Sequence, residues 1–378
     1  MRPVIALLVA LGSVAAFAQS TGWKSAAPGR AIVLPADHAS HPDYKLEWWY
    51  YTGNLDAAGG QRFGYQLTFF RVGMDAAPVN PSRWAVRDLV MTHLALTDVQ
   101  GRRFYMTDRM NRPGPGWAGA ATDRYRVWNE DWSAGIARSR VHELRASAGH
   151  GPLATGDGNN GDFGIELDLN EDRAPVLHGD RGYSRKGSSP GNVSYYYSLT
   201  RMPTTGAVRI GNARIPVTGL SWMDHEFGTN FLEQDQAGWD WLSVQLDDGS
   251  DLMMFQLRRR DGSTDPHSSG TVVEPGGRTR AIANPSAFSM TPGRRWKSPA
   301  SGANYPVAWT VRVPDVSIDL TIAAVLDDQE LRTTASTGVT YWEGAIDVSG
   351  TRAGKPVKGR GYLEMTGYSG QAMGEVMR

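Results

Sequence analysis

The stretch LEWWYYTGNLDAAGGQRFGYQLTFFR (residues 46–71) recurs in outline in the second half of the chain. Leu55 follows Trp48 at the same spacing at which Leu246 follows Trp239 in WDWLSVQLDDGSDLMMFQLRRR (residues 239–260). Each copy has an aromatic strand, a turn that contains glycine and a return strand. Chance similarity between two β-hairpins is the alternative. We interpret the repeat as two related β domains side by side.

Short strand-like runs with alternating, β-branched and aromatic residues fill the rest of the chain, and Gly, Asn and Asp turns separate them. No long window shows helical periodicity. This pattern predicts an all-β fold of antiparallel barrels or sandwiches. We place the domain boundary after Gly228, which gives domains at 19–228 and 229–378. The Gly- and Ser-rich stretch 181–190 is interpreted as a surface loop.

The first 18 residues have the pattern of a secretory signal peptide. Arg2 precedes an apolar run over residues 4–14, and Ala16-Phe17-Ala18 fits a cleavage site that leaves Gln19 as the new N-terminus. A buried N-terminal helix is the alternative. No later stretch is long and apolar enough for a transmembrane span. We therefore expect a periplasmic or secreted protein.

Composition narrows the function further. The chain has no cysteine, which excludes disulfides and thiol chemistry. The 39 basic and 39 acidic residues balance and are dispersed, so we expect no nucleic-acid partner. The 13 tryptophans and 14 tyrosines are typical of β proteins that line a ligand cavity, although they also fill barrel cores.

The most informative motif for chemistry is GLSWMDHEFG (residues 219–228), which contains Asp224, His225 and Glu226. On a strand, Trp222, Asp224 and Glu226 share one face. A carboxyl group that is buried against tryptophan has a raised pKa and can stay protonated as an acid. The alternative is a strand end whose charges face water or pair with arginines.

Other reaction classes find little support. No histidine spacing typical of a metal site is present, so we expect no metal. The spacing of residues along the chain does not test for a metal site assembled from distant strands. No serine lies in a recognisable catalytic-triad context, and a Gly-rich phosphate loop is also missing from the sequence. We expect no cofactor.

Seven segments, in order, resemble the carotenoid 1,2-hydratase (hydroxyneurosporene synthase) family and its AttH-like relatives. They are residues 42–55, 64–71, 177–180, 194–201, 222–228, 341–344 and 361–368. The resemblance implies two lipocalin-like β domains with a cleft between or within them. It also implies activity toward an isoprenoid or phenylpropanoid double bond, to which family hydratases add water. Their acid is an aspartate two residues after an aromatic residue, as Asp224 follows Trp222, although the hydratases carry tyrosine at the aromatic position.

Two functional hypotheses follow. The first is a cofactor-independent hydro-lyase that acts on an apolar unsaturated substrate, with Asp224 as the acid and His225 or Glu226 positioning it or a water molecule. The second is a non-catalytic carrier of a lipid or isoprenoid, with an envelope ABC transporter as a candidate partner. In both, the ligand-binding candidates are aromatic: Trp48, Tyr50, Tyr195, Tyr197, Trp222, Trp239 and Trp241.

Overall fold

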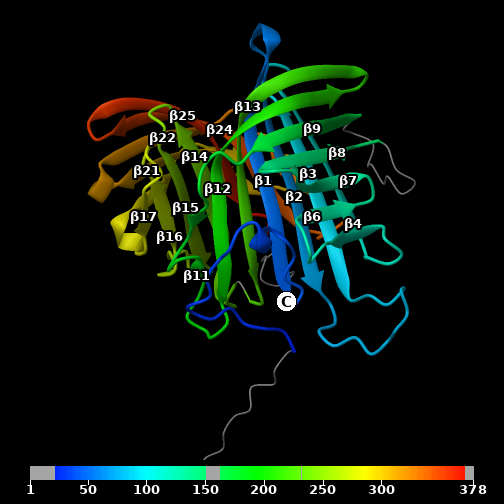
Figure 1. Cartoon of the computed structure of the whole chain (residues 1–378). Coiled ribbons are helices and arrows are strands. Elements are labelled where there is room, and N and C mark those ends of the chain that lie inside the picture. The colour runs from blue at the N-terminus through cyan, green and yellow to red at the C-terminus, as the bar shows by residue number, and fades with distance from the viewer. Residues whose placement is uncertain (1–21, 150–161, 231, 371–378) are drawn as a thin grey trace, which may run out of the picture.

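The computed structural model describes residues 22–149, 162–230 and 232–370, and it confirms the all-β fold. Two large antiparallel sheets dominate it, and Figure 1 shows the blue-to-green strands of the first beside the yellow-to-red strands of the second. The predicted signal peptide lies outside the described residues. Helical structure in these ranges consists of short 3-10 turns: η1 (Ala36–His38), η2 (Ala58–Gly60), η3 (Pro285–Ala287) and η4 (Pro314–Val316).

The first sheet contains the strands up to Gly228, in the spatial order β4-β3-β2-β1-β13-β12-β9-β8-β7-β6-β5, with β10 and β11 beside β12. Strand β1, the first along the chain, therefore pairs with β13, the last. The two edges of the sheet also approach each other, because Asn129 of β6, near one edge, donates to the Thr92 hydroxyl of β3, near the other. The strands are β1 (Leu46–Ala57), β2 (Arg62–Gly73), β3 (Asp88–Asp98), β4 (Arg103–Asn111), β5 (Ala118–Ala120), β6 (Arg126–Asn129), β7 (Trp132–Arg138), β8 (Val141–Ser147), β9 (Phe163–Asn170), β10 (Val176–Leu177), β11 (Tyr183–Arg185), β12 (Val193–Ile210) and β13 (Ala213–Gly228).

In the second sheet, too, the first long strand along the chain pairs with the last. The first hairpin of this sheet, β14–β15, contains the repeated motif, and β14 pairs with the last strand β25 as β1 pairs with β13. The spatial order is β17-β16-β15-β14-β25-β24-β22-β21-β18, with β23 beside β24 and a separate β19–β20 ribbon. The strands are β14 (Gln236–Leu246), β15 (Asp251–Arg259), β16 (Ser269–Val273), β17 (Thr279–Ile282), β18 (Ser289–Pro292), β19 (Arg295–Lys297), β20 (Asn304–Pro306), β21 (Ala308–Val313), β22 (Ile318–Ala324), β23 (Glu330–Arg332), β24 (Thr340–Arg352) and β25 (Lys355–Met365).

The three largest hydrophobic clusters among the described residues lie inside the two sheets and between them. The first two are the interiors of the two sheets, centred on large side chains such as Trp49 and Trp342. The third lies where the sheets meet and includes Tyr50, Tyr196 and Trp241. Strand β1 and residues 221–228 of β13 therefore have both faces buried, which explains why residues 46–55 are apolar and aromatic with little polar alternation. The division of the chain at residue 228 stays a prediction. Among the described residues, no helix has the length and apolar character to cross a membrane.

A glycine marks the closest approach of the sheets. A Cβ atom added at Gly64 of β2 would lie 2.5 Å from the Cβ atom of Ala345 on β24. Both positions are buried, so neither backbone can move away without disturbing the third cluster.

We predict that Gly64→Ala lowers the free energy of unfolding by about 1–3 kcal/mol because it overpacks this contact. Ala345→Gly in the same chain should restore much of the loss. The matched control is Gly276→Ala, since an added Cβ there meets no atom within 4 Å. Urea unfolding of the four variants measures the effect. Equal stabilities of Gly64→Ala and Gly276→Ala would contradict the close packing of the sheets.

Candidate functional site

A cavity of about 120 Å³ lies between the two sheets, with room for several water molecules. Strands of both sheets contribute to its wall, which contains both aromatic and acidic side chains. The described residues that line it are Leu46, Glu47, Trp48, Tyr50, Thr68, Phe70, Arg71, Val72, Met91, His93, Lys186, Tyr196, Asp224, Glu226, Leu232, Trp239, Trp241, Phe255, Leu257, Thr337, Tyr341, Glu343 and Glu364.

Asp224 lies in the wall of this cavity and is only 3% exposed. Its position follows from the register of β13, which places it opposite Tyr50 of β1 and Ser198 of β12. Three side chains donate hydrogen bonds to its carboxyl group: Trp222 Nε1 at 2.6 Å, Tyr196 Oη at 2.8 Å and Ser198 Oγ. No cation of the described residues forms an ion pair with it, so the arginine pairing that would mark a structural carboxylate does not occur there.

Burial raises the pKa of Asp224 to about 7, although the three donors oppose the shift. The negative charge of Glu226, two residues further along the same strand, adds to the increase. Asp224 is therefore partly protonated at neutral pH. A carboxylic acid in this state can donate a proton to a weak base.

Glu226 has a different partner. Lys186 Nζ lies 3.1 Å from its Oε1, and the Ser194 hydroxyl donates to the same oxygen. The Lys186 ammonium also lies over the rings of Tyr196 and Phe255. Sequence reasoning missed this lysine because it falls in the stretch 181–190, which was interpreted as a surface loop. In the structure, Lys186 follows β11 and is buried.

The second sheet supplies two more carboxyl groups, from Glu343 on β24 and Glu364 on β25. The pKa of Glu364 is raised to about 7, mainly by burial and also by the charges of Asp224 and Glu226, while a hydrogen bond with Trp239 opposes the shift. Burial and the charge of Glu364 hold the pKa of Glu343 well above its usual range, while Tyr50 Oη donates to Glu343 at 3.0 Å. Reasoning from the sequence did not identify either glutamate as a site residue. The motifs at 341–344 and 361–368 contain them, but nothing in those motifs indicates a common cavity.

A hydrogen-bonded chain leads from Asp224 away from the cavity. Ser198 Oγ contacts His178 Nε2 at 2.6 Å, and His178 Nδ1 contacts the Thr271 hydroxyl of β16 at 2.9 Å. Burial holds the pKa of His178 well below its usual range, so its ring is neutral. Neutral imidazole can accept a proton on one nitrogen and release one from the other. His178, one of the scattered histidines of the sequence, thus connects the acid to the second sheet.

Five of the seven aromatic candidates gather at this site. Trp48, Tyr50, Trp239 and Trp241 line the cavity, while Trp222 is buried behind Asp224. Trp241 also donates to Tyr196 Oη at 3.0 Å, which orients the hydroxyl group that contacts Asp224.

The structure corrects the expected positions of Tyr195, Tyr197 and His225, because all three project from the opposite face of β12 and β13. Tyr195 pairs with Phe227 and Tyr197 with His225 in the strand register, whereas Tyr196 pairs with Glu226 on the cavity face. The sequence places Tyr195 and Tyr197 together, but it does not show that Tyr196 shares a face with Asp224.

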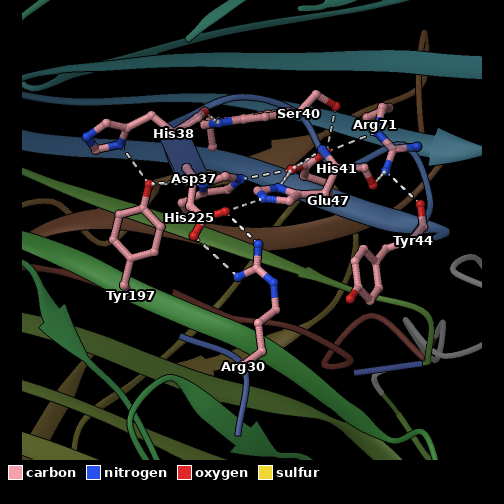
Figure 2. A network of polar contacts seen from close by, with 11 residues as sticks. Arg30, Asp37, His38, Ser40, His41, Tyr44, Glu47, Arg71, Tyr197 and His225 are labelled. Carbon is pink, nitrogen blue, oxygen red and sulfur yellow. Dashed lines mark hydrogen bonds and ion pairs between the residues drawn. The ribbon is translucent and has the colours of Figure 1, made fainter. Parts of the chain in front are cut away.

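His225 belongs to a polar network inside the first sheet, which Figure 2 shows around Glu47. Glu47 is contacted by His225 Nε2 at 3.0 Å, His41 Nδ1 at 2.7 Å and Arg71 Nε at 3.1 Å. Burial alone would raise the pKa of Glu47, but the bonds to His225 and His41 and the charge of Arg71 hold it well below its usual range. This network ties the N-terminal segment to β1, β2 and β13.

A model of AttH-like proteins matches residues 25–368, which is nearly the whole described chain.

The chain belongs to the AttH-like family. A protein of Nitrosomonas europaea that is assigned to AttH has a crystal structure similar to this one, with 35% sequence identity and a TM-score of 0.80. That match covers 91% of this AttH-like protein and 99% of the other chain.

Two fungal proteins are more distant. The structure of kievitone hydratase from Nectria haematococca has a TM-score of 0.66 at 15% identity, over 91% of this chain and 96% of the other. The dehydratase asqC of Emericella nidulans is 20% identical over 242 residues, which are 61% of this chain. The AttH-like chain spans 63% of the length of that dehydratase.

The raised pKa of Asp224 predicts a dependence of stability on pH. The folded state holds the Asp224 proton up to about pH 7, whereas the unfolded chain releases it near its ordinary pKa of 3.8. The contribution of Asp224 is therefore complete below about pH 4 and is lost as the pH rises through about 7.

Asp224→Asn removes this dependence. We expect the variant to gain stability relative to the wild type between about pH 4 and pH 8, by up to about 4 kcal/mol. Denaturant unfolding of both proteins across this range measures the difference. A difference that does not change with pH would show that Asp224 has an ordinary pKa.

Proposed function

We propose that this AttH-like protein is a hydro-lyase that adds water to, or removes it from, a carbon–carbon double bond of an apolar substrate. The observation that carries the proposal is Asp224, a carboxyl group with a pKa of about 7 in the wall of an aromatic cavity, without a cationic partner among the described residues. A buried carboxyl group costs stability, so its retention favours a chemical role over simple ligand carriage.

In the hydration direction, the Asp224 carboxylic acid transfers its proton to one alkene carbon. A new C–H bond forms, and the other alkene carbon becomes cationic. The ring faces of Trp48 and Trp241 line the same cavity and can stabilise this positive charge. Dehydration runs through the same steps in reverse.

A base must then take a proton from the attacking water, and we assign this role to Glu364. Its pKa of about 7 leaves part of the population ionised at neutral pH. Glu343 is less suitable because burial and the charge of Glu364 hold its pKa well above the usual range and keep it protonated, although the hydrogen bond from Tyr50 opposes this shift. The water oxygen bonds to the cationic carbon and one water proton goes to Glu364. The cycle closes when Glu364 releases that proton and Asp224 takes one up, for which Ser198 and His178 offer a hydrogen-bonded route.

The comparisons support this class of reaction. One fungal protein of the same fold is a hydratase, and a sequence relative is a dehydratase. The resemblance to carotenoid 1,2-hydratases suggests an isoprenoid or phenylpropanoid substrate, and the cavity walls suit an apolar one.

To test the proposal, the protein is incubated with kievitone or with an acyclic carotenoid in ¹⁸O-labelled water, and the products are analysed by mass spectrometry. Hydration should add one labelled water. We expect Asp224→Asn to reduce turnover at least about 100-fold, because the general acid is lost. The wild type should have a bell-shaped pH profile near neutrality, since the acid must be protonated and the base ionised.

The matched control is Asp240→Asn. Asp240 is also buried with a pKa raised to about 6, but it contacts Arg258 and Tyr368 rather than the cavity. Its turnover should stay close to that of the wild type. Unchanged turnover in Asp224→Asn contradicts the assigned acid. Saturable quenching of tryptophan fluorescence by both probes, without turnover of either, favours the carrier hypothesis.

We also propose that the protein acts after export, on the basis of the signal pattern at residues 1–18. Expression in a Gram-negative host should give a periplasmic chain that begins at Gln19, as measured by intact mass. A cytoplasmic chain that keeps residues 1–18 would contradict export. An envelope ABC transporter is proposed as a partner only under the carrier hypothesis.

A further inference from the structure

The first barrel contains two groups of two histidines and one glutamate, and their hydrogen bonding differs. In each group the nearest nitrogen and carboxylate atoms all lie within 4.8 Å of one another. One group is His41, Glu47 and His225, which belongs to the network of Figure 2. The other is His38 of η1, His142 of β8 and Glu171, the residue after β9.

In the first group, every ring nitrogen has a partner. His41 contacts Glu47 and Asp37, while His225 contacts Glu47 and Tyr197, at distances of 2.7–3.0 Å. Arg71 also lies on the Glu47 carboxylate. These groups neutralise each other, so this cluster needs no metal ion.

In the second group, one ring nitrogen of each histidine takes no part in a hydrogen bond. His38 Nε2 and His142 Nε2 are buried, and neither has a hydrogen-bond partner. Both face the same oxygen of Glu171, with Oε2 at 3.6 Å from His38 and 3.8 Å from His142. These distances exceed those of hydrogen bonds. Two donors on one tetrahedral zinc ion lie about 3.3 Å apart, so each histidine–glutamate distance exceeds that spacing by only a few tenths of an ångström, and all three donor atoms lie within 4.8 Å of one another.

The far nitrogen of each ring is held in place. His38 Nδ1 contacts Tyr197 Oη at 2.7 Å, and His142 Nδ1 contacts Tyr51 Oη at 2.8 Å. A hydrogen bond at the far nitrogen is what orients histidine ligands in metal sites. Figure 2 shows the bond between His38 and Tyr197.

The protons of this network assign the tautomer of His38. Burial lowers the pKa of His225 to about 4, so its ring is neutral and its Nε2–H donates to the Glu47 carboxylate. Tyr197 has a single hydroxyl proton, which it gives either to His225 Nδ1 at 3.0 Å or to the backbone oxygen of Asp37 at 3.2 Å. Tyr197 must then accept from His38 Nδ1–H. With Nδ1–H donated to Tyr197, His38 turns its Nε2 atom toward the Glu171 carboxylate, where it has no hydrogen-bond partner.

We propose that His38, His142 and Glu171 bind a divalent transition-metal ion such as zinc, with water as the fourth ligand. Two imidazoles and one carboxylate are a donor set that zinc takes in proteins. Glu171 is the one partly exposed member, with a side chain 10% exposed, which gives the ion an entry path. The exposed Arg140 lies 3.8 Å from the other carboxylate oxygen, Oε1, and leaves Oε2 to the ion. The metal joins η1, β8 and the end of β9, and it is separate from the Asp224 cavity.

The test uses the tag-free mature protein, stripped of metal with a chelator and titrated with zinc chloride by calorimetry. We expect one zinc ion per chain and a higher Tm with zinc. His142→Ala and Glu171→Gln should each weaken zinc binding at least about tenfold, with Glu171→Gln as the variant that disturbs packing less. His267→Ala is the control and should bind as the wild type does, since His267 is a half-buried histidine paired with Asp265 in the second sheet's half of the chain.

Four results would overturn the proposal. The first is no saturable binding near one ion per chain, and the second is equal affinity for zinc in the wild type and Glu171→Gln. The third is loss of binding in His267→Ala, and the fourth is loss of binding in His41→Ala while His142→Ala still binds zinc. The second of these is the signature of an adventitious ion only. Asp224→Asn should bind zinc normally, so failure of the metal site and failure of the proposed hydro-lyase activity are distinguishable.

Discussion

The site depends on the alternation of side chains along two strands that are buried on both faces. In β1 and β13, one face packs into the first barrel and the other meets the second sheet. Neighbouring residues therefore enter different environments: Asp224 enters the aromatic cavity, while His225 enters the polar network around Glu47. Desolvation by burial raises the pKa of Asp224 to about 7, whereas the bonds to His225 and His41 and the charge of Arg71 hold the pKa of Glu47 well below its usual range.

Much of this arrangement could be predicted from sequence. The repeated hairpin indicated two sheets, and strand periodicity placed Trp222, Asp224 and Glu226 on one face. Periodicity along a single strand does not set its register against a neighbour, however. For this reason Tyr195 and Tyr197 were grouped with Asp224, although the register gives that place to Tyr196.

Groups from the other half of the chain were harder to find. Glu343 and Glu364 approach Asp224 only because the two sheets pack against each other, and sequence patterns do not encode that packing in a local form. Lys186 was not recognised from the sequence because it lies in a Gly- and Ser-rich stretch, which is typical of a surface loop. The cluster of His38, His142 and Glu171 likewise combines residues from separate segments, which is why the spacing of histidines gave no sign of it.

The central claim is that the pKa of Asp224 is raised to about 7, so that its carboxyl group is protonated in mildly acidic solution and partly protonated at neutral pH. Infrared difference spectroscopy of wild type against Asp224→Asn observes it directly, because the carbonyl stretch of a protonated carboxyl group is separate from the carboxylate bands. The account predicts a protonated-acid band at about pH 5 that is absent from Asp224→Asn and that titrates away with a midpoint of about 7. A wild-type spectrum in which Asp224 already contributes a carboxylate band at about pH 5 would contradict the account.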